Sequence, residues 1–343
     1  MTTLPSGSLE QFLSASSKKK NKSFFPRPNI DYHLEYTNFK QQMNVHVHQH
    51  VTPGAVSHDR GRLTDHGADH IAKVIKQCGA LINGSGVEIT PYEAFLLLKA
   101  AHIHDIGNIS GREHHEKKAA EVLKSAGFGG SDAAEMRAIT RIAAVHGGSI
   151  NGNHDTIASL QIRDDVMGFP VDFQKLAAIL RLGDELADDI TRADLVSAGL
   201  GTLPISSEIY HKYASGLHSV RVDHDAQQIN MRFEFEKSDF LKRFGKGKTK
   251  VYLIHEILRR TSKLYSEMQY TSQFILPGII LRRVSVGISV YDHNEHVDEF
   301  GYRISTDGWT SGKYGSIYKL APELKSLVSG ARLNARELIK KYR

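Results

Sequence analysis

Residues 95–107 read FLLLKAAHIHDIG, a run that predicts a buried helix ending at His104 and Asp105. Nearly every position up to Ile103 is apolar, so all faces of this helix should be covered by protein. A histidine and an aspartate at the end of a buried helix need partners, because an isolated buried charge is costly unless it is paired or binds a metal. Metal binding is therefore one explanation of this run.

More helices are expected on both sides of the run. Ile71, Val74 and Ile75 recur at helical spacing, and the patterns within 119–123, 132–145, 157–162 and 173–186 also predict helices. Several of these segments carry one histidine or aspartate each, at or near an end. These residues are His70, His115, His146 and Asp184.

The types of these side chains limit the chemistry of a metal site. The only cysteine of the chain is Cys78, so imidazole and carboxylate groups would have to be the ligands. Such a mixed set suits one or two divalent ions of Mn, Mg, Fe, Co, Ni or Zn. A centre of this kind activates water and neutralises phosphate oxygens, so it favours hydrolysis of a phosphate ester.

The order His70, then His104-Asp105, then Asp184 resembles the H…HD…D pattern of the HD superfamily of metal-dependent phosphohydrolases. The flanking residues agree, notably LKAAHIHDIGN around the dipeptide and LRLGDEL around Asp184. With His115 and His146 the chain resembles members that hold two metals, with Asp105 as the bridge. The resemblance implies that all six residues are metal ligands and catalytic residues.

Several further residues are candidates for binding substrate. Arg163 and Arg192 are candidates to bind phosphate bidentately, together with Arg181. His66 either caps its helix or contacts substrate. Lys246 and Lys248 belong to a basic stretch at 242–250, which would bind phosphate groups or simply form a solvated turn.

The second half of the chain follows a different pattern. Apolar residues alternate with polar ones at 220–222, 229–235 and 284–290, which predicts strands, and 251–274 has a helical stripe. We therefore expect an α+β module over 205–343. It would follow an all-helical HD domain over 56–200, so that the protein as a whole is mainly α.

Residues 1–55 have little apolar periodicity and are expected to form an N-terminal extension. Their alternating Val-His run at 45–50 is expected to be an edge strand or a loop. The last segment, 320–343, should contain one or two short helices.

Composition sets the broad class of the protein. The chain has 343 residues, enough for two ordinary domains, and is 40% hydrophobic and 24% charged, which is globular composition. The longest apolar stretch, 274–281, is too short to span a bilayer, and no secretory signal is evident at the N-terminus. We expect a cytoplasmic protein without a membrane partner.

These expectations together favour a hydrolase that acts on a phosphate ester of a nucleotide. One alternative is a nuclease for single-stranded DNA or RNA. The modest net charge of +6 does not distinguish a nuclease from a hydrolase of nucleotides. Another is an adaptor that binds a nucleotide at a slow site. The resemblance is closest to stand-alone bacterial HD proteins, some of them linked to antiviral defence, and it implies a possible homo-oligomer.

Overall fold

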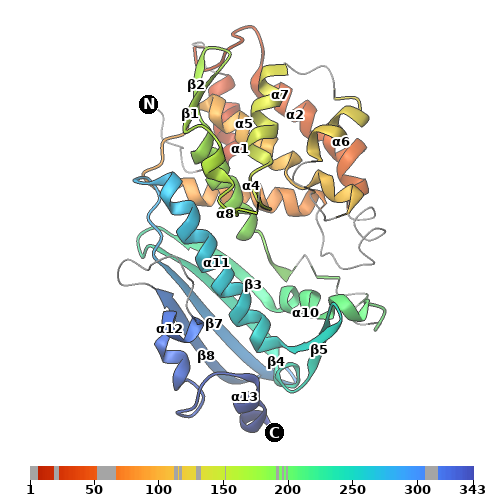
Figure 1. Ribbon diagram of the computed structural model, residues 1–343, viewed down its shortest axis with the longest axis vertical. Coiled ribbons are helices and arrows are strands. Elements are labelled where there is room, and N and C mark those ends of the chain that lie inside the picture. Colours follow the sequence, from red (N-terminus) through yellow and green to blue (C-terminus); the bar gives the residue numbers. More distant parts are fainter. Residues whose placement is uncertain are drawn as a thin grey trace. The chain divides into compact units, whose positions relative to one another are not determined.

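The structure is a computed structural model, and its described residues fall into two compact units (Figure 1). The first unit contains residues 1–187 and 271–279, and the second contains 188–270 and 280–343. The described residues are 7–18, 23–51, 67–111, 115, 118–128, 133–150, 152–190, 193–194, 197, 200–305 and 316–343.

The first unit is built mainly from helices around α5. Its α-helices are α1 (Leu9–Ser17), α2 (Tyr32–Met43), α4 (Ala68–Ile82), α5 (Pro91–Ile103), α6 (Ala119–Ser125), α7 (Ala133–Ala143) and α8 (Phe173–Glu185). Short helical turns lie at η1 (Asn44–His48), η2 (Ile106–Ser110) and η4 (Ile157–Ser159). Helices α1, α2, α7 and α8 all contact α5. The predicted buried helix is thus confirmed as the centre of this unit.

Local sequence explains where α5 begins. The Thr90 side chain accepts a hydrogen bond from the Glu93 amide, and the Glu93 side chain accepts one from the Thr90 amide. This capping box satisfies two amide groups that have no partner inside the helix, and Pro91 stands at the position where a missing N–H costs nothing. All thirteen residues of α5 are buried.

The expectation that residues 1–55 form an extension differs from the structure. Helices α1 and α2 belong to the first unit, and Phe12 and Leu13 of α1 are buried. The Val-His run was expected as a strand or loop, which is wrong, because residues 44–48 form a π-helical turn that continues α2. Val47 and His48 are neighbours in the chain, and both are buried. In a strand, successive side chains point to opposite faces, so the alternating pattern could not predict this.

The first unit is also not all helical. Strands β1 (Arg163–Val166) and β2 (Phe169–Asp172) form an antiparallel hairpin just before α8. The predicted helix over 157–162 is therefore wrong, since only the short turn η4 forms there. The turn of this hairpin is Met167-Gly168, both with positive φ, and that turn closes the two strands.

The second unit contains a four-stranded sheet, a hairpin and one long helix. Its strands are β3 (Leu217–Asp223), β4 (Gln228–Glu236), β5 (Arg243–Lys246), β6 (Thr249–Tyr252), β7 (Arg283–Asp292) and β8 (Glu295–Ser305). Its helices and turns are η6 (Ile205–Ser207), α10 (Glu208–Gly216), η7 (Lys237–Phe240), α11 (Leu253–Ile275), α12 (Ile317–Leu320), η8 (Pro322–Lys325) and α13 (Ala335–Tyr342). The last turn of α11, from Thr271, belongs to the first unit.

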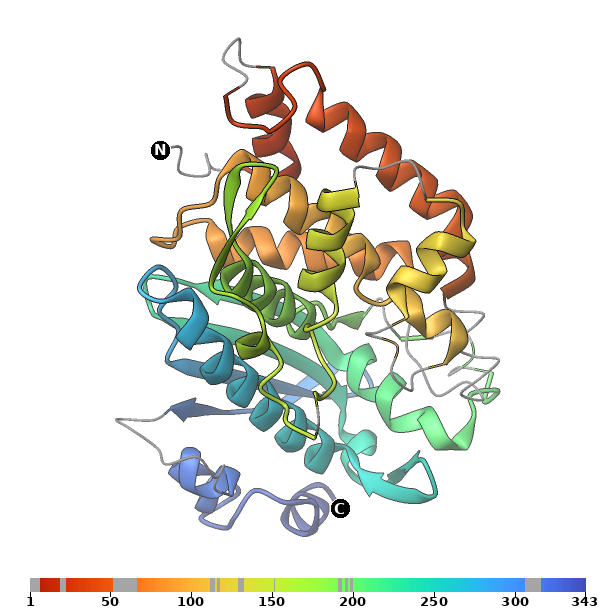
Figure 2. The same ribbon diagram turned by 45° about the horizontal axis from the view of Figure 1, so that its top comes forward.

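The sheet of the second unit has the order β3-β4-β7-β8, with β4 and β7 parallel and the other pairs antiparallel. Helix α11 lies across one face of it (Figures 1 and 2). Val284, Val286, Ile288 and Val290 of β7 are buried at alternate positions, as a half-covered strand requires. The hydroxyl groups of Thr261 on α11 and Tyr302 on β8 lie 2.8 Å apart within this core.

The described residues form three sheets as well as the helices, so the protein is a mixed α+β protein. The expectation of a mainly α fold is wrong. The sequence pattern did not reveal the hairpins β1–β2 and β5–β6, because their strands of four residues are too short to show a clear two-residue period.

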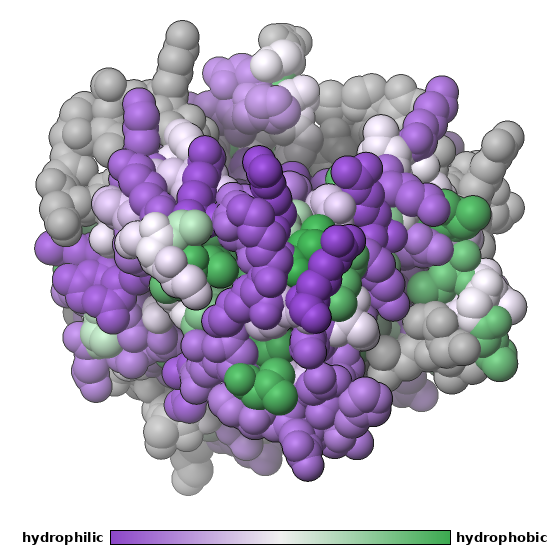
Figure 3. All heavy atoms as spheres, turned by 90° about the horizontal axis from the view of Figure 1, so that it is seen from below, coloured by the Kyte–Doolittle hydropathy of each residue, from purple (hydrophilic) through white to green (hydrophobic). Residues whose placement is uncertain are grey.

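Within the part of the chain that the structure describes, no helix has both the length and the apolar character needed to cross a membrane. One face of the molecule, drawn by hydropathy in Figure 3, is largely hydrophilic, with small hydrophobic areas between polar side chains.

Candidate metal centre

Six side chains that are far apart in the sequence converge in the first unit. His70 lies in the first turn of α4, His104 and Asp105 follow the end of α5, and Asp184 lies in the last turn of α8. His115 lies between η2 and α6, and His146 follows α7. Their ligand atoms form two groups that could each hold a metal ion, and Asp105 belongs to both.

The first group consists of His70, His104, Asp105 and Asp184. His70 Nε2 lies 3.1 Å from Asp184 Oδ1 and 3.7 Å from Asp105 Oδ2. His104 Nε2 lies 3.5 Å from each of the same two oxygens. Two nitrogens and two oxygens therefore face one another.

The second group uses the other oxygen of Asp105. His115 Nε2 lies 3.1 Å and His146 Nε2 lies 3.5 Å from Asp105 Oδ1. The two oxygens of one carboxylate thus face separate sets of imidazoles. This is the arrangement that a carboxylate bridging two cations requires, and it fits the ligand role that the resemblance implied for Asp105.

Main-chain carbonyls orient two of the histidines. His104 Nδ1 lies 2.8 Å from the Ala101 carbonyl oxygen, and His146 Nδ1 lies 2.6 Å from that of Ala143. When Nδ1 donates its proton to a carbonyl, the lone pair of a neutral imidazole is at Nε2, the atom that faces the carboxylates. His104 Nε2 is buried and makes no hydrogen bond. These features fit a metal at this position.

Two glycines allow the ligands to come close. A Cβ atom on Gly183 would lie 2.5 Å from Cys78 Sγ, so Gly183 permits the close contact of α8 with α4 that brings Asp184 to His70. A Cβ atom on Gly107 would collide with the main-chain carbonyl of His115. Gly107 therefore admits the segment that carries His115 beside the end of α5.

Buried charge strongly perturbs the site. Burial lowers the pKa of His104, but the neighbouring Asp105 and Asp184 carboxylates outweigh it and hold that pKa well above the usual value. Burial raises the pKa of Asp184, but the imidazoles of His104 and His70 that face this carboxylate outweigh it and hold that pKa well below the usual value. A cation bound between these carboxylates would compete with a proton on His104, so metal binding should release protons.

Exposure differs across the cluster. The side chains of His70 and His104 are fully buried, whereas those of Asp184 and His115 are 27% and 15% exposed. Solvent therefore reaches the cluster beside Asp184 and His115.

The structure describes only some of the other predicted site residues. His66 and Arg192 lie outside the described residues. Arg163 is exposed at the start of β1, opposite Asp172 in the hairpin. Arg181 is buried in α8 and donates a hydrogen bond to Thr156 Oγ1 at 2.9 Å.

Lys246 and Lys248 lie in the second unit, in and beside the hairpin β5–β6. Lys246 Nζ is 2.6 Å from Glu256 Oε2, so its charge already has a buried partner. Lys248 is exposed. A role of either residue in binding substrate stays a prediction.

Sequence reasoning missed a buried polar chain beside the cluster. Tyr36 donates to Glu10 Oε1 at 2.6 Å, His102 Nε2 lies 3.2 Å from the Tyr36 hydroxyl, and His48 Nε2 lies 3.2 Å from His102 Nδ1. Burial lowers the pKa of His48 to about 4, so this imidazole is neutral near pH 7. Only the tertiary fold joins these residues, since the chain positions carry no common motif.

A comparison with protein families agrees with this geometry. The family model HD-CE matches residues 60–263, more than half of the chain. This chain belongs to the HD-CE family. The match covers all six residues of the cluster, so an HD-type domain with a His/Asp cluster that could bind metal is established. Membership of an HD-type family indicates a metal-dependent hydrolase. No curated protein matches the chain.

Proposed function

We propose that this HD-CE protein hydrolyses a phosphate ester of a nucleotide at the His/Asp cluster. The observation that carries the proposal is the position of Asp105, whose two oxygens face separate groups of imidazoles. Six residues of this kind would hold one or two divalent ions. A metal held there supplies positive charge to a phosphate oxygen and activates a water for attack on phosphorus.

The exposure of the cluster's side chains indicates the side from which substrate would enter. His70 and His104 form the closed side of the cluster, and Asp184 and His115 border the side open to solvent. A phosphate group that enters beside Asp184 and His115 would therefore meet the ligands from the open side. His115 and His146 lie against the same oxygen of Asp105 and would serve as ligands or as proton donors to the leaving group.

A nuclease that cleaves single-stranded DNA or RNA is the second candidate. It would use the same centre, because hydrolysis of a phosphodiester needs the same metal chemistry. The exposed Lys248 and Lys250, in and beside the turn of β5–β6, favour this candidate, since they would offer positive charge to the phosphates of a nucleic acid.

The first experiment measures metal content and turnover together. The wild type is assayed with added Mn on a panel of nucleotides and short oligonucleotides, and is compared with His104→Ala/Asp105→Ala. The matched control is His154→Ala/Asp155→Ala, which removes the same dipeptide from an exposed loop outside the cluster.

We expect the first double variant to lose metal and activity, and the control to keep both. The class of substrate that the wild type hydrolyses then decides between nucleotide and nucleic acid. A folded wild type that binds no metal and hydrolyses nothing would overturn the proposal. Equal activity in the wild type and in His104→Ala/Asp105→Ala would also overturn it.

A further inference from the structure

A buried hydrogen-bonded link joins two segments that carry candidate metal ligands. The Thr156 hydroxyl donates to the Val145 main-chain carbonyl at 2.8 Å and accepts a hydrogen bond from Arg181 Nη1 at 2.9 Å. Thr156 is 1% exposed, and Arg181 is also buried. A hydroxyl has one proton to donate and lone pairs to accept with, so one side chain can hold both partners at once. We call these three groups the Thr156 link.

The two ends of the Thr156 link lie next to ligands of different groups. Val145 directly precedes His146, a member of the second group. Arg181 lies on α8 three residues before Asp184, a member of the first group. Residues three apart on a helix share a face, so Arg181 and Asp184 are adjacent on α8. The Thr156 link therefore connects a ligand-bearing segment of one group to that of the other.

The segment that carries His146 gains little support from regular structure. Helix α7 ends at Ala143, three residues before His146, and Gly147-Gly148 follows directly. Glycine leaves the main chain many conformations, so the chain after His146 adds little restraint. A carbonyl beyond the end of a helix has no partner inside it, and the Thr156 hydroxyl supplies a donor to Val145. The link therefore holds the main chain directly beside His146.

Helix α8 is a firm support for the other end of the link. Every residue from Leu176 to Gly183 is buried, and Gly183 permits the close contact of α8 with α4. Close packing on this scale leaves a helix little room to move. Arg181 therefore extends its guanidinium from a part of the chain that is fixed by packing. This group stays charged at any physiological pH, so the link does not depend on titration.

A small shift of His146 would matter to a metal ion. Its Nε2 lies 3.5 Å from Asp105 Oδ1, and its ring centre lies 4.9 Å from that of His104 and 5.4 Å from that of His115. Distances between a metal and its ligands vary by only about 0.2 Å. The Ala143 carbonyl orients the ring of His146, whereas the link fixes the position of its main chain.

We propose that Thr156 is a positioning residue for the second metal ion. Its hydroxyl fixes the main chain at His146 relative to α8, and this position determines how tightly the second group holds an ion. That group consists of Asp105, His115 and His146. Thr156 acts through His146 and does not touch the ion. The inference rests on the proposed function only through the metal centre, and it holds for either substrate.

The test measures binding of Mn²⁺ to the full chain, stripped of metal with a chelator, by isothermal titration calorimetry. Thr156→Val removes the hydroxyl and keeps the branched shape, whereas Thr156→Ser keeps the hydroxyl. Thr156→Val is also combined with His115→Ala, which lacks a ligand of the second group only. Urea unfolding confirms that each variant is folded.

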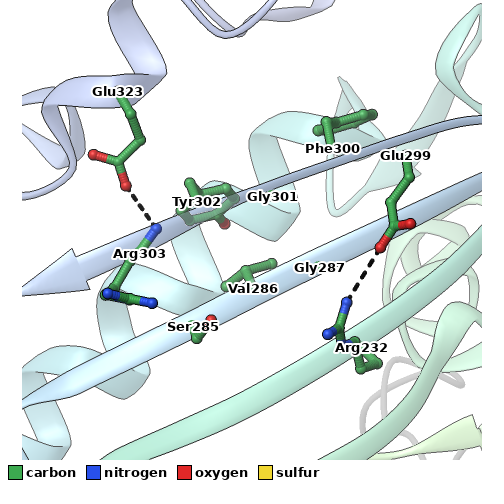
Figure 4. A pocket seen from close by; sticks show the side chains of 10 residues that line it. All are labelled: Arg232, Ser285, Val286, Gly287, Glu299, Phe300, Gly301, Tyr302, Arg303 and Glu323. Atoms are coloured by element: carbon green, nitrogen blue, oxygen red, sulfur yellow. Dashed lines mark hydrogen bonds and ion pairs between the residues drawn. The ribbon is translucent and has the colours of Figure 1, made fainter.

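The matched control is Thr261→Val in the second unit, whereas all six candidate ligands belong to the first. Thr261 is fully buried, and its hydroxyl lies 3.0 Å from the Ile257 carbonyl oxygen and 2.8 Å from the Tyr302 hydroxyl. Figure 4 shows Tyr302 on β8, among the residues that line a pocket of this unit. The control therefore removes a buried, hydrogen-bonded threonine hydroxyl from a unit without candidate ligands.

We expect the wild type to bind two ions, and Thr156→Val to bind one of them about 10- to 100-fold more weakly. Loss of this size is typical when a group that orients a metal ligand is removed. Thr156→Ser should bind both ions like the wild type. In the His115→Ala background, Thr156→Val should leave the affinity for the remaining ion unchanged, because the group that it affects is already lost. Thr261→Val should lower stability and leave both affinities unchanged.

A second variant covers the case in which Thr156→Val does not fold. Thr156→Cys replaces the hydroxyl with a thiol, which has a similar size and is a weaker donor. It should weaken binding of the same ion, by less than the loss of the hydroxyl altogether.

Several results would overturn the inference. They are equal affinities in the wild type and Thr156→Val, an equal loss in Thr156→Ser or Thr261→Val, and a loss that Thr156→Val spreads equally over both ions. A wild type that binds a single ion, with the same affinity in His115→Ala, would also overturn it but would leave the proposed hydrolysis standing. A wild type that binds no ion would overturn both.

Discussion

The two units contain two buried charged clusters that are neutralised in opposite ways. In the first unit, the carboxylates of Asp105 and Asp184 face the imidazoles of four histidines. In the second unit, buried Glu256 accepts hydrogen bonds from Lys246, Arg259 and Arg260 at 2.6, 2.5 and 3.1 Å. The chain neutralises Glu256 with its own cations, whereas the cluster at Asp105 depends on titratable imidazoles.

The difference indicates which cluster is built for a ligand. Permanent cations keep Glu256 neutralised at any pH where it is ionised, so that cluster is structural. An imidazole can lose its proton and then bind a metal, so the cluster at Asp105 can exchange protons for a cation. Substitutions in either cluster can test this contrast.

Replacing the shared carboxylate should have the largest effect. Asp105→Asn removes the charge that faces both groups of imidazoles, so we expect loss of bound metal and a fall in turnover of about 10³-fold or more. Metal analysis and steady-state kinetics measure both effects. Asp155→Asn, in the exposed loop after His154, is the control, and it should change neither. Retention of full metal content by Asp105→Asn would contradict this account.

Removing the buried carboxylate of the second unit should affect stability and not metal content. Glu256→Gln removes the buried counter-charge of Lys246 and Arg259 and one of the two carboxylate partners of Arg260, so we expect a loss of about 3 kcal/mol in the free energy of unfolding. Urea unfolding measures it. Glu234→Gln, which removes an exposed partner of His218, should cost less than about 1 kcal/mol. A loss of metal in Glu256→Gln would contradict the separation of the two clusters.

The contribution of Glu256 should depend on pH in a defined window. Burial raises its pKa, but hydrogen bonds from Arg259 and Lys246 outweigh this and lower it to about 2. As the pH falls, Glu256 is therefore protonated in the unfolded state before it is protonated in the folded state. Its contribution to stability, about 3 kcal/mol, is complete above the ordinary pKa near 4.5. It should decrease from there and vanish near pH 2. The difference in unfolding free energy between wild type and Glu256→Gln, measured from pH 6 downwards, should shrink in this window; a constant difference would refute it.

A smaller effect is expected for a ligand that belongs to one group only. His115→Ala should lower the number of bound ions while His70, His104, Asp105 and Asp184 still hold one. We expect turnover to fall by about 10- to 100-fold, less than for Asp105→Asn. Metal titration followed by calorimetry measures the stoichiometry. An unchanged number of bound ions would show that His115 is not a ligand.

Prediction from sequence succeeded where the signal was local. The apolar run at 95–103 and the period of α11 each set an element by themselves, because burial on all faces or on one stripe leaves a regular pattern. Prediction from sequence failed for the short elements. The Val-His run alternates like a strand but continues a helix, and the hairpin β1–β2 was missed.

The site shows the same division. The resemblance carried by the order of histidines and aspartates was enough to select six candidate ligands, and the structure brings all six together: His70, His104, Asp105, His115, His146 and Asp184. The substrate-binding residues were harder to predict, because an arginine or lysine has the same appearance in sequence whether it is free or paired. Lys246 is paired with buried Glu256, ten positions away, and no local pattern indicates this.

The amino-acid sequence alone was sufficient to predict the candidate ligands and their order, the central buried helix and the strands of the second half, which begin at Leu217. These features follow from side-chain chemistry and from periods of a few residues. The packing of the folded chain, by contrast, sets which imidazoles face each oxygen of Asp105, and it places α1 and α2 in the first unit. Each of these depends on contacts between residues far apart in the chain, where the register and packing of whole elements set the geometry.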